Sequence, residues 1–503
     1  MNRLFVLCAL TLTMIGCGGG GGGGSKSSTP TTSKASSLAA SSKAASSTVG
    51  GVSSSSAISA SSQSSVPSGA ANTDPLAISN EGAVDGKVAI DDQGNAIAIW
   101  HELNTNAFAS HSLWMNRYVK GTGWGKAQLL ESDAGNVSES NLYIDSASGR
   151  AVVIWEQFTS ASQDDLWVRR FDPATGWSAA DRIENLDTTL GIFPQAIIDG
   201  AGNVLAVWAQ MDKPYGTFSI WSNRYTAVAG WGTAATIENN NVVGGMDGSP
   251  SLASLGNGNA VAVWVTSGDG VHISTNVYSS STGWGTASQL VTDSGTDMSL
   301  NFPKVVADGA GKALLAWGQW DFVNSASVSN VFVKNYNNGW SQQAINVGSH
   351  QGSDLISNPS VTSNNNGVAA VTWGRKDQAV MANVRASNGS WGQASVIKAA
   401  NADSVLSVPQ VGIDGAANAM LVWPHQSNDR SSKDSWFSTF TIAGGNWSAG
   451  QLLEPYKGTA IEPRIAVNSN GDRVVIWYNI TDFSNIGSQI YARYFPAGTA
   501  AKP

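Results

Sequence analysis

The strongest constraint on the fold is a tandem repeat marked by tryptophan. Tryptophan ends a short apolar run eight times, at intervals of 50 to 56 residues: Trp100, Trp155, Trp208, Trp264, Trp317, Trp373, Trp423 and Trp477. A second tryptophan follows a turn rich in Gly, Asn or Ser seven times: Trp124, Trp177, Trp231, Trp284, Trp340, Trp391 and Trp447. A period of this length indicates an array of small units that bury their apolar faces against their neighbours.

The clearest unit runs from Phe193 to Glu238. Residues 195–199 and 203–208 are apolar runs with β-branched residues, and the Gly-Ala-Gly between them favours a tight hairpin. Residues 220–225 alternate apolar and polar side chains as a third strand, and residues 231–238 form a fourth. Four strands in about 50 residues are typical of one blade of a β-propeller.

The two tryptophan series differ by one, which indicates how the array ends. The last unit has no fourth strand, whereas residues 75–80, ahead of the first unit, have the pattern of one. We therefore predict an all-β fold: an eight-bladed β-propeller of four-stranded antiparallel blades over residues 74–497, closed by the N-terminal strand, with a tail at 498–503. Closure leaves no open sheet edge. The alternative is an open solenoid or a string of independent β-units.

The N-terminus carries an export signal. Residues 1–16 combine Arg3 with an apolar run from Leu4 to Ile15, which is too short to span a bilayer. The sequence Thr13-Met-Ile-Gly-Cys17 resembles the lipobox of bacterial lipoproteins, with Met14 where that pattern most often has Leu. The resemblance implies cleavage before Cys17 and lipidation of its thiol, a lipoprotein signal peptide rather than an ordinary one with a chance cysteine.

Residues 17–73 are predicted to be a disordered tether. A glycine run is followed by Ser, Ala and Thr with almost no large apolar residue, so the segment cannot bury a core. The tether resembles the polyserine linkers of secreted polysaccharide-degrading systems in Gram-negative bacteria. Gly18 after the lipidated cysteine implies sorting to the outer membrane, so we expect a protein anchored at the outer membrane or cell surface. The other cysteine, Cys8, lies in the removed signal, so no disulfide is expected.

Charge and motifs exclude several functions. The net charge of −8 and the absence of a Lys/Arg run argue against a nucleic-acid partner. No metal-ligand spacing, nucleophile elbow or phosphate loop is present, so we expect no metal and no cofactor, and a monomer. The repeat is similar to tandem-repeat lectin- and sialidase-like propellers. However, the Asp-box of sialidases is not matched, since Trp208 comes nine residues after Asp199 and no Thr precedes it.

Polar residues are expected around one face of the ring, where the first strands begin and the second strands end. Such a ring of polar groups suits a hydroxyl-rich ligand, although strand ends are also polar because they reach water. The candidates are Lys87, Gln195, Lys304 and Arg464 at the strand starts, and Gln157, Gln210, Gln319 and Arg375 at the strand ends.

Trp320 is the one tryptophan that the repeat does not explain. It is expected on the longest loop between second and third strands, next to Gln319 and Asp321. An aromatic ring at such a place could stack on a sugar, or pack beneath its own loop.

A pair of cations is predicted beside the ring axis. The eighth blade abuts the first in a closed ring, so Arg464 and Lys87 should be neighbours and could receive a uronic acid carboxylate. The alternative is that each cation pairs with a nearby acid, as Arg464 could with Glu462.

Catalysis has thinner support. Glu102 and Glu156, on neighbouring blades, could serve as acid and base in glycoside cleavage, and His425 could act as a base in a lyase. The prediction is a surface-tethered propeller that binds carbohydrate. Its alternatives are a polysaccharide lyase or glycoside hydrolase, and a protein-interaction scaffold in the cell envelope.

Overall fold

The computed structural model divides the chain into two units, Met1–Pro67 and Ser68–Pro503, and the residues that it describes all belong to the second. They are 74–104, 110–131, 135–160, 163–184, 190–213, 216–238, 247–267, 270–292, 299–300, 303–323, 326–351, 356–375, 379–398, 404–405, 408–426, 433–454, 459–480 and 487–498. The predicted signal peptide, Cys17 and the tether lie outside these residues.

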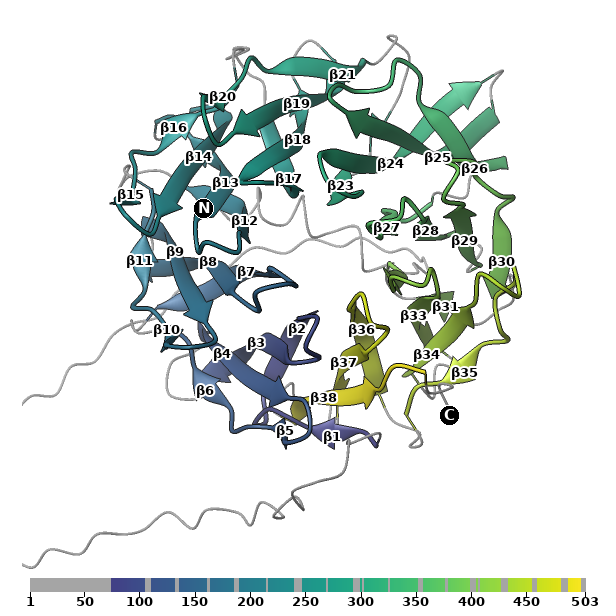
Figure 1. The fold of residues 1–503 in the computed structure, drawn as a ribbon, viewed down its shortest axis with the longest axis horizontal. Helices are drawn as coiled ribbons and strands as arrows, with labels where there is room; N and C mark the ends of the chain where they lie inside the picture. The colour runs from purple at the N-terminus through teal and green to yellow at the C-terminus, as the bar shows by residue number, and fades with distance from the viewer. Residues whose placement is uncertain are drawn as a thin grey trace, which may run out of the picture. The chain divides into compact units, whose positions relative to one another are not determined.

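Each repeat folds into an antiparallel blade, and eight blades form a propeller ring (Figure 1). Blades 7 and 8 are joined into one sheet by a single parallel pairing, Lys433 opposite Thr459. The alternating and apolar runs become strands because one unit buries both faces of its sheet against its two neighbours. Within each blade the first strand lies nearest the axis and the fourth lies at the rim. This confirms the predicted fold class.

The fourth strand of blades 1 to 4 is broken into two short pieces. Blade 1 consists of β2 (Ala83–Ile90), β3 (Ala96–Asn104), β4 (Ser110–Val119), β5 (Gly123–Trp124) and β6 (Gln128–Leu129). Blade 2 consists of β7 (Asn136–Ile144), β8 (Ala151–Ser160), β9 (Gln163–Asp172), β10 (Gly176–Trp177) and β11 (Asp181–Arg182). Blade 3 consists of β12 (Gly191–Ile198), β13 (Val204–Met211), β14 (Phe218–Thr226), β15 (Gly230–Trp231) and β16 (Ala235–Thr236). Blade 4 consists of β17 (Asp247–Gly256), β18 (Asn259–Ser267), β19 (Val271–Ser279), β20 (Gly283–Trp284) and β21 (Ser288–Thr292).

The remaining blades vary more, chiefly in the first strand. Blade 5 consists of β22 (Ser299–Leu300), β23 (Lys304–Ala307), β24 (Lys312–Val323), β25 (Ala326–Asn337) and β26 (Ile345–Gln351). Blade 6 consists of β27 (Ser360–Ser363), β28 (Ala369–Gly374), β29 (Val380–Arg385) and β30 (Ser395–Lys398). Blade 7 consists of β31 (Ser404–Val405), β32 (Gln410–Ile413), β33 (Ala419–Gln426), β34 (Lys433–Phe440) and β35 (Gln451–Leu452). Blade 8 consists of β36 (Thr459–Val467), β37 (Arg473–Ile480), β38 (Ser488–Phe495) and β1 (Leu76–Ala77).

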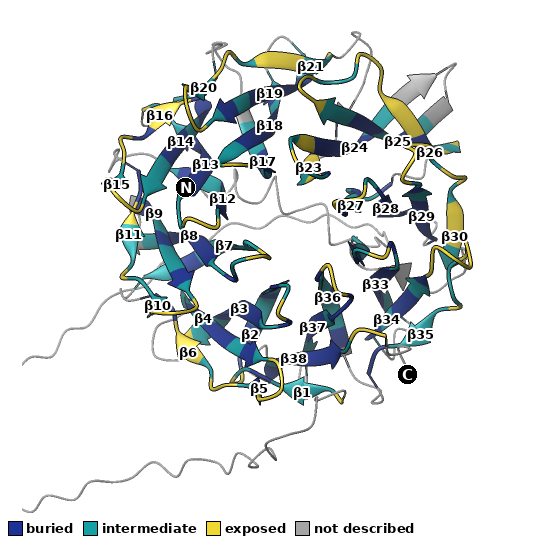
Figure 2. Cartoon of the chain, viewed as in Figure 1, coloured by how far each residue is buried: buried dark blue, intermediate teal, exposed yellow. Residues whose placement is uncertain are grey.

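The eight repeat tryptophans form the core between blades. Each is between 0% and 2% exposed, and each packs on the preceding blade, as Trp100 does on Ile476 and Ile490. Burial is concentrated in the second and third strands, whereas rim strands such as β16 and β30 are largely exposed (Figure 2). In the part of the chain described here, no helix is long and apolar enough to cross a membrane.

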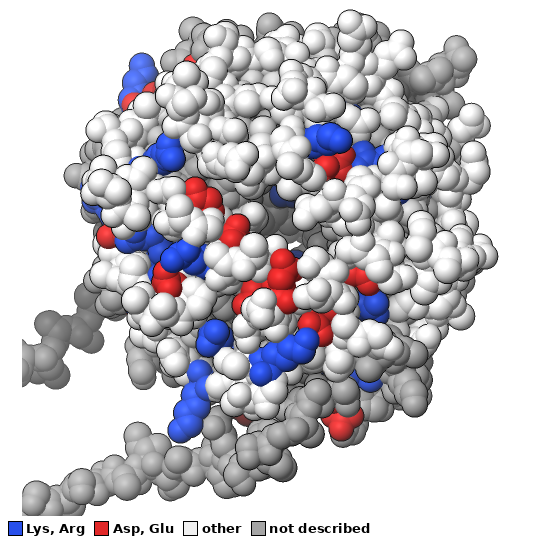
Figure 3. Space-filling model, viewed as in Figure 1, with Lys and Arg blue, Asp and Glu red and all other residues white. Residues whose placement is uncertain are grey.

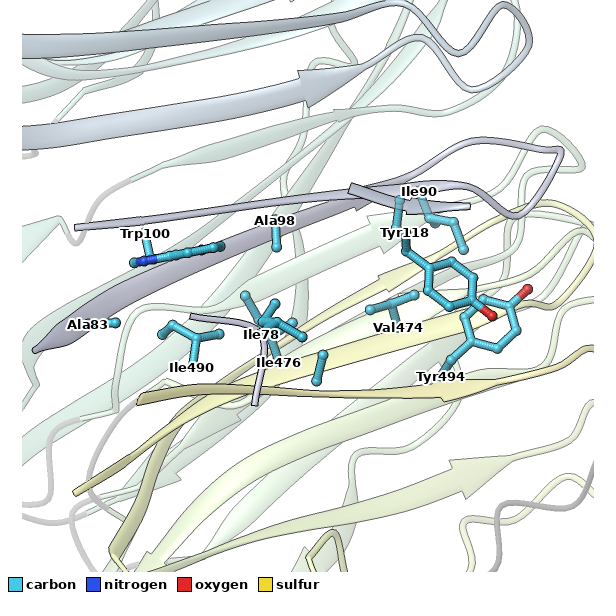
Figure 4. Packing of buried hydrophobic residues seen from close by; sticks show 12 residues of the cluster. Ile78, Ala83, Ile90, Ala98, Trp100, Tyr118, Val474, Ile476, Ile490 and Tyr494 are labelled. Carbon is cyan, nitrogen blue, oxygen red and sulfur yellow. The ribbon is translucent and has the colours of Figure 1, made fainter. Parts of the chain in front are cut away.

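The N-terminal strand closes the ring, as predicted. β1 pairs antiparallel with β38, Leu76 opposite Ala492, so the first strand of the chain supplies the fourth strand of the last blade (Figure 1). Ile78 follows β1, is 5% exposed and packs in the cluster that contains Trp100 (Figure 4). In the same cluster the rings of Tyr118 and Tyr494 stack with their centroids 4.6 Å apart. The N-terminus and C-terminus of the propeller are therefore held in one core.

A polar side chain on the third strand links most blades to the blade before. In seven of the eight blades this residue donates a hydrogen bond of 2.6 to 3.1 Å to a main-chain carbonyl at the outer edge of the preceding blade. The donors are Asn116, Arg169, Asn223, Asn276, Lys334, Asn383 and Arg493. Asn116 bonds to Ile78, so the same link also spans the closure.

The hairpins between first and second strands add a second closing contact. Asn468 and Asn470 of blade 8 donate amide hydrogen bonds to the carbonyls of Asp91 and Asp92 of blade 1, at 2.9 and 2.6 Å. The Ser469 hydroxyl donates to the Asp92 carboxylate at 2.6 Å. Closure thus depends on hydrogen bonds at the hairpins as well as on the shared sheet of blade 8.

Candidate functional site

The first strand of each blade is irregular at one common point. In five blades the register shifts there by a β-bulge, and in blades 5 to 7 the strand is interrupted. Proline lacks an N–H for the sheet ladder, and it occupies this point in six blades: Pro194, Pro250, Pro303, Pro359, Pro409 and Pro463. A bulge re-aims a side chain, and here the bulged residues lie on the strands nearest the axis.

Blades 8 and 1 bring two cations and two acids together at this point. Asp85 and Glu462 are the bulged residues, with φ of 50° and 51°, a conformation that non-glycine residues seldom adopt. Lys87 lies 3.5 Å from Asp85, and Arg464 lies 3.5 Å from Glu462. Each cation is thus paired with a nearby acid, the alternative arrangement that the sequence left open for Arg464.

The electrostatics join the two pairs. Burial acts to raise the pKa of Asp85, but the nearby charges, first that of Lys87 and then those of His101 and Arg464, hold the pKa below its ordinary value. Burial raises the pKa of Glu462, and the charge of Asp85 adds to that rise. Arg464 and Lys87 therefore flank one ionised carboxylate rather than forming a bare positive pair.

Glu139 and Lys304 extend the group across the opening. Glu139 is at the equivalent bulge of blade 2 and accepts a hydrogen bond from the Phe193 N–H at 3.1 Å. Burial raises the pKa of Glu139, and the charge of Lys87 opposes that rise. Lys304 is on the opposite side of the ring. Its pKa is lowered first by desolvation and then by the charge of Lys87.

We call these six residues the opening cluster: Asp85, Lys87, Glu139, Lys304, Glu462 and Arg464. Its members come from blades 1, 2, 5 and 8, and their charges interact across the axis of the ring. Figure 3 draws the face of the ring on which the hairpins between first and second strands lie, and charged side chains are sparse there.

His101 lies next to Asp85 of the cluster, where blade 1 contacts blade 2. It is 4% exposed, its Nε2 is 3.0 Å from the Ser140 hydroxyl, and its Nδ1 is 3.8 Å from Asp85. Burial lowers the pKa of His101 to about 4, so the ring is neutral at neutral pH. The contact with Asp85 is therefore not an ion pair there, and Ser140, 2% exposed, is shielded from solvent.

The predicted acid and base, Glu102 and Glu156, do not act on one another. Glu102 accepts hydrogen bonds from the Trp100 indole and the Asn80 amide, both at 3.2 Å. Glu156 is 2% exposed and accepts from the Ser138 hydroxyl at 2.6 Å. Burial raises the pKa of Glu156 well above its usual range, and the carboxylates Glu139 and Asp164 add to the rise.

The glutamines that follow the repeat tryptophans accept hydrogen bonds from buried indole groups. Gln157 and Gln210 are each 1% exposed, and their side-chain oxygens accept the indole N–H of Trp155 at 2.9 Å and of Trp208 at 2.6 Å. Gln319 accepts from Trp317 in the same way at 3.4 Å and is more accessible. A buried indole N–H needs an acceptor, which explains a polar residue at this position of the repeat.

Trp320 and Asp321 lie in a strand, not on a loop as expected. β24 continues to Val323 and pairs over its whole length with β25, which begins at Ala326. Trp320 is opposite Ser329 on one side and Ser299 on the other, and it is partly buried. The extended pairing satisfies the main chain of a segment that the sequence pattern did not mark as strand.

The other predicted residues are dispersed around the ring. Gln195 is partly buried at the bulge of β12, and Arg375 forms an isolated bridge with Ile356 beyond β28. His425 is in β33, with its ring 5.4 Å from that of Trp436. The structure does not join these three to the opening cluster by any contact among the described residues.

The sequence analysis missed Asp85 and Glu139, and it named Glu462 only as a possible partner of Arg464. Asp85, Glu139 and Glu462 each stand two residues before a predicted first-strand residue. The signal that could have found them is the X-Pro step of the other six blades, because it indicates a bulge at the position that Gly86 and Ser140 occupy in blades 1 and 2. Within the described residues, no group of three or more His, Cys, Asp or Glu is placed to hold a metal ion.

Comparison with known proteins finds similar solved structures only at low sequence identity. No family model and no curated protein matches the chain. Similar solved structures include the polysaccharide lyase Uly1, with a TM-score of 0.47 and 10% identity over 76% of this chain and 94% of that one. They also include an α-L-arabinofuranosidase from Fusarium graminearum (TM-score 0.39, 10% identity, 75% and 99% covered) and the NanB sialidase from Streptococcus pneumoniae (0.37, 12%, 84% and 70%).

Proposed function

We propose that the opening cluster binds a carbohydrate. The supporting observation is a set of alternating cations and carboxylates on bulges around the central opening. The side chains of Lys87, Asp85, Arg464 and Glu462 are 27%, 37%, 28% and 36% exposed. These groups can donate to and accept from sugar hydroxyls, and neighbouring charges strengthen such hydrogen bonds.

Binding is tested by removing the cations one at a time. Lys87→Ala, Lys304→Ala and Arg464→Ala should each weaken the binding of an acidic oligosaccharide by about 10- to 100-fold, the scale of one charged hydrogen bond. Hits are first found on an array of neutral and acidic glycans, and affinities are then measured by calorimetry. Lys312→Ala is the matched control, because Lys312 is an exposed lysine at the hairpin end of the same blade as Lys304. Unchanged affinities in all three folded variants would place the ligand elsewhere.

A reaction at the same site is the second candidate. The charge of Asp85 adds to the raised pKa of Glu139, whereas the pKa of Asp85 is itself lowered. Acid and base catalysis on a glycoside uses two carboxyl groups whose surroundings shift their pKa values in opposite directions. Reducing-sugar release and unsaturated uronate absorbance, measured on the oligosaccharides that bind, distinguish hydrolysis and elimination from binding alone.

We also propose that the propeller is lipid-anchored through Cys17 at the outer membrane or cell surface. The support is the lipobox-like sequence and the Ser-rich segment behind it. Cells expressing the full chain should incorporate labelled palmitate into it, and Cys17→Ala should abolish the label and release the protein from the membrane fraction. Equal labelling of the variant would rule out this anchor.

A further inference from the structure

A second hollow lies on the outer rim, in the groove between blades 1 and 2. Its volume is about 420 Å³, within the range of small-molecule sites. The residues that line it are Met115, Arg117, Gln128, Leu129, Leu130, Arg169, Phe171, Gly176 and Trp177. The lining includes two arginines and no acid, on a chain whose net charge is −8.

Arg117 is the distinctive group of this groove. Its guanidinium lies over the Phe171 ring, 5.2 Å from the centroid, and it has no carboxylate partner among the described residues. Arg169 bonds to the carbonyls of Ser178 at 2.7 Å and Leu130 at 2.6 Å. Burial lowers the pKa of Arg169, so a nearby anion would stabilise its charge.

In the next groove, between blades 2 and 3, the equivalent cation is neutralised by an acid. Arg170 takes the place of Arg117, and its guanidinium lies 2.9 Å from the Asp181 carboxylate. Asp181 also accepts the indole N–H of Trp231 at 3.1 Å. In blade 1 the equivalent of Asp181 is Gln128, because both residues pair with the same position of the third strand.

In the groove between blades 3 and 4, the equivalent arginine has a hydroxyl group as its partner. There Arg224 lies over the Tyr278 ring, 5.3 Å from its centroid, and donates a hydrogen bond to the Tyr278 hydroxyl. The equivalent of Tyr278 in blade 2 is Phe171, which has no hydroxyl. The first groove therefore lacks both acceptors that its two neighbours use.

We propose that the groove between blades 1 and 2 binds an anionic sugar residue. Its carboxylate pairs with the Arg117 guanidinium, a geometry that arginine favours. The apolar face of the sugar ring packs on Trp177 and on Leu129, which is 46% exposed, and the Gln128 amide bonds to a hydroxyl. This site is on the rim and is independent of the opening cluster.

The test uses Gln128→Asp in the full chain. The new carboxylate should pair with Arg117 as Asp181 pairs with Arg170, so the variant should melt at or above the parent temperature. Its affinity for an oligogalacturonate should fall by about 10- to 100-fold in calorimetry. Arg117→Ala should show the same loss of affinity, whereas Arg224→Ala, in a groove with its own acceptor, should bind as the parent does.

Three results would overturn the proposal: a parent that does not bind oligogalacturonate, parent-like affinity in both Gln128→Asp and Arg117→Ala, or equal affinity for a neutral galactan oligosaccharide. Inorganic sulfate is a further arm, because saturable binding of equal strength would indicate a simple anion site rather than a sugar site. Lys87→Ala separates this groove from the opening cluster. Loss of one binding event in that variant and of another in Gln128→Asp would show two sites.

Discussion

Deleting residues 1–81 should destabilise the propeller by roughly 5 kcal/mol relative to deleting residues 1–68, and should lower the melting temperature sharply. The longer deletion removes β1 and Ile78, which is 5% exposed. It loses the burial of one large aliphatic side chain, about 2 kcal/mol, and several main-chain and side-chain hydrogen bonds at about 1 kcal/mol each. It also leaves β38 as an open edge and the Asn116 amide without the Ile78 carbonyl.

Calorimetry of the two truncated proteins measures the difference. Ile78→Ala in the shorter deletion is the intermediate case, because it keeps the hydrogen bonds of β1 and removes only packing, at a cost of about 2 to 4 kcal/mol. Equal melting temperatures for the two truncations would show that β1 does not hold the ring closed. A longer deletion that aggregates, while the shorter one stays monomeric, would agree with an exposed sheet edge.

Removing the carboxylate of Asp308 should cost about 3 to 5 kcal/mol of unfolding free energy, because it leaves a cation buried without its partner. Asp308 of blade 5 pairs with Arg385 of blade 6, and the two side chains are 8% and 4% exposed. Arg385 also donates to Asn335 at 2.8 Å and to the Gly367 carbonyl at 3.0 Å. Asp308→Ala therefore breaks the centre of a network that ties two blades together.

A double-mutant cycle identifies the cause. Asp308→Ala combined with Arg385→Ala should cost much less than the sum of the two single changes, since neither charge is then left alone. The matched control is Arg150 with Asp172, a pair at 2.8 Å whose side chains are 30% and 31% exposed. Its coupling energy should stay below about 1 kcal/mol, as for other exposed pairs. Similar coupling in both cycles would contradict the assigned role of burial.

Much of the fold was predictable because its evidence is local and periodic. Trp100 and its seven counterparts recur once in each repeat, which predicts one buried tryptophan per blade. All eight are buried. Pro75 to Asn80 matched a fourth strand in pattern, and β1 does complete blade 8. Such features can be recognised without tertiary information, because the residues on the buried face of a strand alternate with the others along the sequence.

The candidate site was less predictable, because polarity at a strand end does not say which way a side chain points. Gln157 and Gln210 are polar at positions near the axis, yet they turn inward to accept tryptophan N–H groups. A shift of one residue moves a side chain to the other face of a sheet, and the bulges make such a shift. The positions of Asp85 and Glu462 follow from those bulges.

The sequence by itself determined the number of blades, their four-stranded form and the closure of the ring, because these follow from side-chain alternation and a fixed repeat length. Tertiary structure alone decided which charges meet. Lys304 and Lys87 are more than 200 residues apart in the chain, yet they influence one another across the opening. Electrostatic interaction depends on distance in space and on the surrounding medium. For residues on different blades, this distance and this medium are defined only once the ring is closed.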